Sequence, residues 1–249
     1  MVQLLPMLEL LRNKRILVVV AHPDDEVIGL GGTMYKLINE QNCQIRAVIL
    51  GEGITSRAEV RDPLKWKSEL EIHRRNIQQA VDTIGYESVG IYNFPDNRFD
   101  TIPLLDIIKV VEQEKRSFNA ETIFTHHGGD VNIDHQKTFE AVITACRPME
   151  GENVKNLITF ETMSGTEWRA SSDPRHFVPN LFFPVSEEAL AAKIKAMEAY
   201  EFERRTYPHP RSPEALRIRA QMWGITNGCY LAEAFQIIRL IIPSTYFRE

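Results

Sequence analysis

The stretch Ile16-Leu17-Val18-Val19-Val20-Ala21 runs without a break into His22-Pro23-Asp24-Asp25-Glu26. Its apolar half is typical of a strand that is buried on both faces of a parallel sheet. The second half places an imidazole beside three carboxylates, and like charges at such close range repel one another. Folding alone gives no reason for that crowding. The stretch therefore predicts a buried strand whose end forms a site.

Similar short runs recur along the chain, separated by longer segments of helical periodicity. Runs rich in β-forming residues lie at 15–20, 45–50, 88–92, 121–125 and 157–161. This alternation predicts an α/β protein with a Rossmann-like, mainly parallel sheet and helices on both faces. We expect one domain over residues 1–249, with a core at about 13–162 and a C-terminal elaboration at about 163–249 over the carboxyl ends of the strands.

Apolar residues at helical spacing indicate where the helices lie. The expected buried faces are Val27, Leu30, Met34, Leu37 and Ile38 of one helix, Leu70, Arg74, Ile77, Val81 and Ile84 of a second, Leu104, Ile108 and Val111 of a third, and Phe139, Val142 and Cys146 of a fourth. Further helices are expected near 186–205 and from Ser212-Pro213-Glu214, where Ser212 suits an N-cap. A short amphipathic helix is expected at residues 3–12.

The composition excludes several classes of protein. Hydrophobic residues make up 43% and charged residues 25% of the 249 residues, which is ordinary for a globular protein. The net charge of -5 argues against a nucleic-acid-binding surface. Cys43, Cys146 and Cys229 are widely spaced, which favours reduced thiols in a cytoplasmic protein. No apolar run approaches the length of a membrane span, and basic residues follow the N-terminal leucines, the wrong order for a signal peptide. The composition leaves open whether the chain forms a homo-oligomer.

A second polar cluster, His126-His127-Gly128-Gly129-Asp130-Val131-Asn132-Ile133-Asp134-His135, follows the apolar strand Thr122-Ile123-Phe124-Thr125. His135 is in helical phase with Phe139, so we expect it to point inward. In open α/β sheets, ligands lie outside the carboxyl ends of the strands, which is where both clusters fall. The structural alternatives are that the acids at 24–26 cap a helix and that His135 is an ordinary buried histidine. Neither explains matching clusters at two strand ends.

Together the clusters offer histidine and carboxylate ligands without cysteine. This combination is typical of a catalytic zinc site that keeps a position open for water, although the same donors accept other divalent ions. Zinc lowers the pKa of bound water to about 7 and polarises a carbonyl, while a nearby free carboxylate passes the water's proton to the leaving group. The clusters therefore predict a metal-dependent hydrolase.

With Ala21, the first cluster reads Ala-His-Pro-Asp-Asp-Glu, and the second ends in Asn132-x-Asp134-His135. These motifs resemble the LmbE/PIG-L family of zinc-dependent N-acetylglucosaminyl de-N-acetylases. Further segments fit the family in the expected order, namely Gly29 to Met34, Leu50-Gly51-Glu52-Gly53 and Phe94-Pro95-Asp96-Asn97. The resemblance implies removal of the N-acetyl group from an N-acetylated amino sugar or sugar conjugate, which gives acetate and a free amine. A small-molecule sugar is the implied partner.

The resemblance also implies roles for individual residues. His22, Asp25 and His135 would bind zinc. Asp24 would be the general base, free of the metal but beside its water. Asp134 would orient the neighbouring groups of the site, as outer carboxylates do around metal-bound histidines.

Asn132 is a departure from the family pattern. Several members have a histidine at this place, which is thought to stabilise the developing oxyanion. An asparagine donates a hydrogen bond but carries no charge, so the role weakens or moves elsewhere. The candidates to replace it are His126, His127 and His209.

Polar residues near other strand ends are candidates for substrate binding. Arg57 follows the second strand, where related enzymes place polar sugar contacts, and Asp96 follows the third. A solvated loop and a turn are their structural alternatives. His209-Pro210-Arg211-Ser212 and Ala232-Glu233-Ala234-Phe235 resemble C-terminal segments of bacterial members, and we expect both to fold back over the site. Arg211 would bind a phosphate or carboxylate of the substrate, or form a structural ion pair.

Two other functions compete with deacetylation. Aspartate and histidine clusters also hold the two-metal centres of phosphoesterases, although that chemistry uses more bridging carboxylates. A sugar- or nucleotide-binding relative without catalysis is the other alternative, and Asn132 is its only support. A nicotinamide enzyme is disfavoured, because Gly29, Gly31 and Gly32 follow the acidic loop and do not form the dinucleotide motif.

Overall fold

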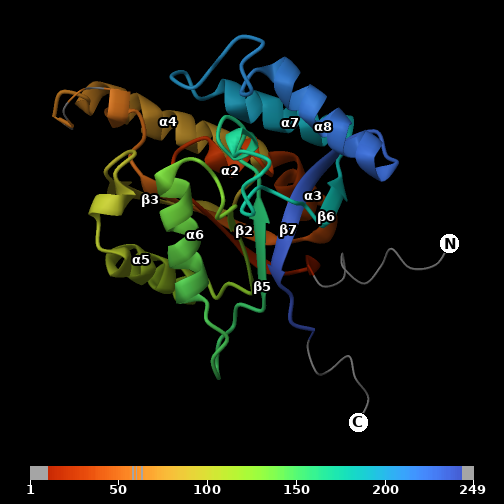
Figure 1. Cartoon of the computed structure of the whole chain (residues 1–249), viewed down its shortest axis with the longest axis horizontal. Helices are drawn as coiled ribbons and strands as arrows, with labels where there is room; N and C mark the ends of the chain where they lie inside the picture. Colours follow the sequence, from red (N-terminus) through yellow and green to blue (C-terminus); the bar gives the residue numbers. More distant parts are fainter. Residues whose placement is uncertain (1–10, 58, 60, 63, 243–249) are drawn as a thin grey trace.

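The computed structural model describes residues 11–57, 59, 61–62 and 64–242, so the helix expected at 3–12 lies almost wholly outside the described residues. One sheet, covered on both faces by helices, organises this part of the chain (Figure 1). Its strands are β1 Arg15–Val20, β2 Gln44–Gly51, β3 Ser88–Phe94, β4 Thr122–His126, β5 Asn156–Phe160, β6 Leu181–Pro184 and β7 Ala232–Arg239. The helices are α2 Asp25–Ile28, α3 Gly31–Gln41, α4 Lys67–Ile84, α5 Leu104–Ser117, α6 Ile133–Ala145, α7 Glu187–Glu198 and α8 Pro213–Asn227.

The strand order confirms the predicted fold class. The strands follow one another as β3-β2-β1-β4-β5-β7-β6, and β1 to β5 pair in parallel. The chain moves from β1 outward to β3 on one side and from β4 outward to β5 on the other. The order therefore reverses between β1 and β4, and ligands of doubly wound sheets bind at this reversal.

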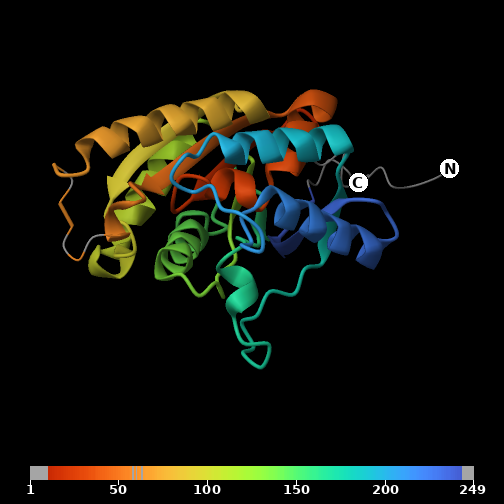
Figure 2. The same cartoon turned by 90° about the horizontal axis from the view of Figure 1, so that it is seen from above.

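Strand β1 is apolar from Ile16 to Val20 because it separates two hydrophobic cores. Ile16, Val18 and Val20 face the core that includes residues of α3 and α4, whereas Leu17, Val19 and Ala21 face the core that includes residues of α5 and α6. All of these β1 side chains are fully buried. Figure 2 shows α4 and α7 side by side, and the two helices pack against each other.

The helix expected over Val27 to Ile38 is two helices in the structure. Helix α2 ends at Ile28, and α3 begins at Gly31 after an irregular Leu30 with φ -146°. Gly29 lies at the break, where an added Cβ would stand 2.2 Å from the carbonyl oxygen of Glu161. The glycines therefore let this segment approach β5 closely, at the cost of helical continuity.

Helix α4 differs in detail from the expected face. Arg74, which we expected to be buried with the apolar residues, is exposed, while His73 and Asn76 are buried. The prediction for Ile77, Val81 and Ile84 is confirmed. His73 lines a polar cavity, described below, and Asn76 donates a hydrogen bond to Glu201.

The C-terminal third extends the sheet as well as covering it. Strands β6 and β7, which we did not predict, add an antiparallel pair beside β5. The expectation that Ala232-Glu233-Ala234-Phe235 folds over the site is wrong, because these residues lie in β7, where Phe235 packs on Phe124. Helix α7 ends at Glu198 instead of near 205, and the segment 199–212 leads to α8.

The predicted start of α8 is confirmed. Ser212 is the N-cap residue, its hydroxyl accepts a hydrogen bond from the backbone N–H of Ala215, and Pro213 opens the helix. Among the described residues, none of the helices has both the length and the apolar content needed to cross a bilayer.

Candidate active site

A cavity of about 230 Å³ lies at the carboxyl ends of the strands. Most of the predicted site residues line it, namely His22, Asp24, Asp25, Arg57, Asp96, Asn132, His135, His209 and Arg211. They come from the loops and helix starts that follow β1, β2, β3 and β4 and from the segment 199–212. The topology therefore assembles the two sequence clusters and adds residues from the C-terminal third.

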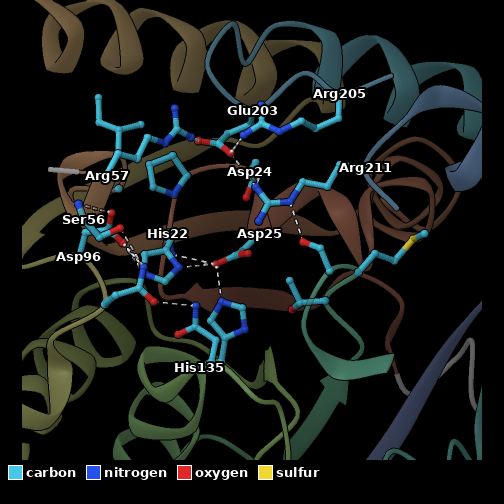
Figure 3. A pocket seen from close by; sticks show the side chains of 18 of the residues that line it. His22, Asp24, Asp25, Ser56, Arg57, Asp96, His135, Glu203, Arg205 and Arg211 are labelled. Atoms are coloured by element: carbon cyan, nitrogen blue, oxygen red, sulfur yellow. Dashed lines mark hydrogen bonds and ion pairs between the residues drawn. The ribbon is translucent and has the colours of Figure 1, made fainter. Parts of the chain in front are cut away.

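His22, Asp25 and His135 form a candidate metal centre at the reversal of the strand order. Their side chains converge in Figure 3, and one donor atom from each lies within 4.8 Å of the others. His22 Nδ1 and His135 Nε2 are each 3.4 Å from Asp25 Oδ2. Asp25 is 2% and His135 4% exposed, so the donors are held in a buried pocket and not on a flexible surface.

The second nitrogen of His22 is fixed by Asp134. His22 Nε2 donates to Asp134 Oδ2 over 2.8 Å, and the fully buried carboxylate also accepts the backbone N–H groups of Asn97 and Phe99. This pairing leaves His22 Nδ1 free to face Asp25. Carboxylates that orient histidines in this way are typical of metal sites.

Asp130 faces the second nitrogen of His135 at ion-pair distance. Asp130 Oδ2 lies 3.2 Å from His135 Nδ1 and accepts a hydrogen bond from the Thr166 hydroxyl over 2.6 Å. Its Oδ1 accepts the backbone N–H of Asn132. We did not predict a role for Asp130, although its place in the second polar cluster was a signal that it belongs to the site.

The ionisation of this centre suits a cation. Burial lowers the pKa of His135, but Asp25 and Asp130 outweigh it and raise the pKa to about 9. Burial likewise opposes protonation of His22, yet Asp134 and Asp25 raise its pKa well above 6.5. Without a metal, protons on the histidines therefore balance the buried carboxylates. A divalent ion would supply that positive charge in their place.

Asp24 stands beside the candidate metal centre in a left-handed backbone conformation, with φ 96°. Its backbone N–H donates to Glu26 Oε2 over 3.0 Å, and Tyr200 donates to the other oxygen of Glu26. Asp24 occupies the N-cap position of α2, but its side chain makes no capping hydrogen bond, so capping does not explain its carboxylate. Strained non-glycine residues of this kind are frequent at functional sites.

The Asp24 side chain is 2% exposed, and Arg211 Nη1 donates to its Oδ2 over 2.8 Å. Burial raises the pKa of Asp24 well above its usual range, and the charge of Arg211 opposes this increase. Arg211 thus forms the ion pair that was the structural alternative to a substrate contact. It also donates to the Ser164 hydroxyl and to Glu203 Oε2.

Glu203 connects two arginines of the cavity, as Figure 3 shows. Arg57 donates to Glu203 Oε1 and Arg211 to Oε2, while Arg205 lies 3.8 Å from Oε2. The Glu203 side chain is 9% exposed. We did not predict Glu203, because nothing in the local sequence of 199–212 marks one acid as a partner of distant arginines.

Asn132 has a structural role that its sequence position does not reveal. It is the N-cap of α6, and its side-chain oxygen accepts the backbone N–H of Asp134 over 2.8 Å. Its side-chain nitrogen donates to Asn97 Oδ1 over 3.2 Å and lies at the cavity wall. A neutral amide donor therefore occupies the place where we expected a weakened or missing oxyanion group.

His126 and His127 do not line the cavity, contrary to our expectation for both. His126 is fully buried, its Nε2 accepts the backbone N–H of Ala21, and its Nδ1 is 2.9 Å from the Thr162 hydroxyl. Burial lowers its pKa to about 4, and its ring stacks on His135 at 3.9 Å. His127 Nε2 bonds to the carbonyl oxygen of Arg175. Both nitrogens of His126 are thus used within the fold.

Asp96 and His209 both line the cavity. Asp96 Oδ2 accepts the backbone N–H of Ser56, its Oδ1 accepts the side-chain N–H of Asn97, and Oδ1 is 3.4 Å from His22 Nε2. His209 Nδ1 accepts the backbone N–H of Arg211 over 3.1 Å. Of our three candidates to replace the family histidine, His209 is the one that borders the cavity.

The fold and site define a Rossmann-like α/β protein with a candidate metal centre at the switch point of its sheet. Residues 17–146 match the family described as PIG-L, GlcNAc-PI de-N-acetylase. The chain belongs to this family. It is 25% identical over 195 residues to the uncharacterized deacetylase YaiS of Escherichia coli (strain K12), an alignment that covers 76% of this chain and 92% of YaiS.

Solved structures show the same fold. N,N'-diacetylchitobiose deacetylase from Pyrococcus horikoshii aligns with a TM-score of 0.69 at 18% identity, covering 98% of this chain and 91% of that chain. GalB, the 4-carboxy-2-hydroxymuconate hydratase of Pseudomonas putida KT2440, also aligns with a TM-score of 0.69 at 18% identity, covering 92% and 98%. Because a deacetylase and a hydratase share this fold, the reaction has to be argued from the site.

Proposed function

We propose that the protein is a metal-dependent hydrolase that removes the N-acetyl group from an N-acetylated amino sugar or sugar conjugate, giving acetate and a free amine. The observation that carries this proposal is the donor set of half-buried His22 and buried Asp25 and His135, with the carboxylate of Asp24 beside it in a small polar cavity. The family description and the deacetylase relatives support the same reaction.

Zinc is the metal that best fits these donors. Two imidazoles and one carboxylate are a three-ligand set that leaves a fourth position open, as in catalytic zinc sites. The orientation of His22 by Asp134 and of His135 by Asp130 supports this fit. When bound, zinc would lower the pKa of water and polarise the acetamide carbonyl.

Asp24 is the proposed general base. Its Oδ2 is held by Arg211, which leaves Oδ1 for a proton. Asp24 would take one proton from the water that attacks the acetyl carbonyl and return it to the nitrogen as the C–N bond breaks. The released products are acetate and the amine. Asn132 supplies a neutral N–H donor at the cavity wall for the oxygen of the reacting amide.

The structure gives less support to a two-metal phosphoesterase. The other group of potential ligands among the described residues is His22, Asp96 and Asp134, and it shares His22 with the first. Asp134 already accepts the N–H groups of His22, Asn97 and Phe99. A second ion would have to displace these donors. The complete first ligand set likewise argues against a relative that only binds sugars.

The volume of the cavity limits how much of a substrate can enter it. At about 230 Å³ it is smaller than the pockets of 300 Å³ or more that hold drug-sized ligands. A single sugar ring with its acetamido group is therefore the part of the substrate that we place inside. The remainder of a larger sugar conjugate would extend beyond the cavity.

Acetate release from a panel that includes N-acetyl-D-glucosamine and N,N'-diacetylchitobiose tests the proposal. The purified full-length chain, stripped of metal and reloaded with zinc, should release acetate, and Asp24→Asn should lower kcat by about 100-fold or more. Asp106→Asn, an exposed substitution on α5, is the matched control. Absence of acetate release from the whole panel, or full activity in Asp24→Asn, would contradict the proposal. Two ions per chain with phosphate release from a phosphomonoester would favour the phosphoesterase.

A further inference from the structure

His73 lies on α4, outside the sequence motifs, and lines the cavity. Its side chain is 2% exposed, and its Nδ1 has no hydrogen-bond partner among the residues that the structure describes. Within that part of the chain, His135 is the only other cavity residue with an unpartnered buried side-chain atom, and its Nδ1 faces Asp130 at 3.2 Å. His73 is therefore a polar residue of the cavity wall whose Nδ1 forms no hydrogen bond with another described residue.

The ring of His73 is held in place by its neighbours. Tyr200 and Phe202 pack edge-on against it, with ring centroids 5.8 Å and 6.0 Å away. On the other side, His73 Nε2 lies 3.2 Å from the position that a Cβ on Gly53 would occupy, beside Pro23. Gly53 and Pro23 both line the cavity. The aromatic residues thus pack against the ring, and its Nε2 lies beside Gly53 at the cavity wall.

A buried nitrogen without a partner is costly. Because Nδ1 is out of contact with solvent, a ligand in the cavity can reach the ring only at Nε2. Most histidines have their tautomer set by a hydrogen bond at the second nitrogen, and no described residue does this for His73. Burial, and to a smaller extent the charge of Arg57, lowers the pKa of His73 to about 4, so the ring is neutral at about pH 7. It can present either an N–H or a lone pair at Nε2. A hydroxyl, which both donates and accepts, matches this property.

The charges of the cavity also favour an uncharged partner. Arg57 is paired with Glu203, and Arg211 with both Glu203 and Asp24. An anionic substituent would have to compete with these carboxylates for the same guanidinium groups. A neutral sugar hydroxyl near His73 would not compete with these carboxylates for the guanidinium groups.

We propose that His73 is a specificity-determining residue that hydrogen-bonds a hydroxyl of the sugar ring bound in the cavity. This inference rests on the proposed function, because it concerns the substrate of the same site. The contact would select among N-acetylated sugars by the presence and position of one hydroxyl. A site built to bond a hydroxyl rejects analogues that lack it, since its own polar group is then left unpaired.

The test uses the zinc-loaded full-length protein with N-acetyl-D-glucosamine and the set of its monodeoxy analogues, each lacking one hydroxyl. His73→Phe keeps an aromatic ring between Tyr200 and Phe202 but removes both nitrogens. We expect KM for N-acetyl-D-glucosamine to rise by about tenfold with a smaller change in kcat. The variant should also lose the discrimination that the wild type shows against one analogue. His73→Gln, which restores a donor and an acceptor, should recover part of it.

Two controls separate this role from a structural one. His176→Phe makes the same substitution at a half-buried histidine outside the cavity and should leave KM unchanged. The imidazole nitrogen resonances of His73, assigned by their loss in His73→Phe, should shift when N-acetyl-D-glucosamine is added to the wild type. A folded His73→Phe with unchanged KM and unchanged discrimination would overturn the inference, as would resonances that do not move.

The failures of the two proposals are distinguishable. If Asp24→Asn loses acetate release while His73→Phe behaves as wild type, the role of His73 is wrong and deacetylation stands. If the wild type releases no acetate from the sugar panel, the deacetylase proposal fails. In that case the His73 resonances still decide whether the cavity binds the sugar through this residue.

Discussion

Two regions of the cavity, here called the floor and the rim, are held in place by different interactions. The floor consists of His22, which follows β1, and of Asp25 and His135, which lie in the first turns of α2 and α6. Buried carboxylates face both histidines. The rim consists of long side chains from 199–212, such as Glu203 and Arg211, which pair with residues far away in the sequence. The floor thus takes its geometry from the backbone, and the rim takes its geometry from ion pairs.

Removing a carboxylate below the floor should have the largest effect. In Asp134→Ala, the side chain of His22 and the backbone N–H groups of Asn97 and Phe99 lose a buried acceptor. We expect metal affinity to fall by about 10- to 100-fold and unfolding free energy to fall by several kcal/mol. Chelator competition and thermal unfolding measure these changes. Asp100→Ala, at an exposed position nearby, should alter neither. Wild-type metal affinity in Asp134→Ala would show that the backbone alone positions His22.

Without metal, the stability of the folded protein should depend on pH in the direction set by the pKa of His135. Its pKa is raised from 6.5 to about 9 in the folded protein, so its stabilising contribution is complete below about 6.5 and disappears as pH rises through about 9. The loss is on the order of 3 kcal/mol. Urea unfolding between about pH 6 and about pH 9.5 should show this loss of stability in the metal-free protein and not in the zinc-loaded protein. Equal slopes for both forms would contradict the charge balance proposed for the floor.

A change at the rim should affect catalysis without affecting metal binding. Arg211→Ala removes the partner of Asp24 Oδ2 and should lower kcat by about 100-fold, the cost of misplacing a reacting group by about 1 Å. Zinc affinity should stay within about twofold, because Arg211 does not contact the ligands. Arg205→Ala, which removes a guanidinium 3.8 Å from Glu203, is the control with a smaller expected effect. A parallel loss of zinc in Arg211→Ala would mean that floor and rim are not independent.

Substitution of Asn132 should have the smallest effect, and it tests whether this cavity residue acts in catalysis or only caps α6. Asn132→Ala removes an N-cap and should cost about 1 kcal/mol of stability. Ser186→Ala removes the N-cap of α7, outside the cavity, at a similar cost. Both variants should show a similar shift in thermal midpoint. Acetate release should fall in Asn132→Ala alone. Equal activity in the two variants would leave Asn132 with a capping role only.

The floor was predictable because it depends on local pattern and on sheet topology. The apolar β1 segment, followed at once by His22 and Asp25, and the helical phase of His135 predict side chains at one edge of a parallel sheet. The structure brings these residues together as a candidate metal centre. That the centre binds zinc stays a prediction. Family resemblance, and not spacing, supplied the individual roles.

Other features were not predictable from local pattern. Strands β6 and β7 escaped prediction because one is short and only partly buried, and the other is half exposed toward its end. His126 sits in a segment that looks like a site, yet its nitrogens bond to Ala21 and Thr162. His73 lies on α4, where the apolar spacing predicted that Arg74 is buried and gave no sign of His73. In each case the environment depends on residues from another element.

The sequence by itself therefore determined the parallel part of the sheet and the polar clusters at its strand ends, because backbone periodicity places side chains relative to the few residues around them. The family resemblance then named the candidate metal ligands within those clusters. The tertiary structure alone determined that Arg211 holds Asp24, a residue 187 positions earlier, and that Glu203 joins Arg57 to the same network. Long charged side chains have many rotamers and many potential partners. Which pair forms depends on how the connecting segments fold, and local sequence does not encode that distance.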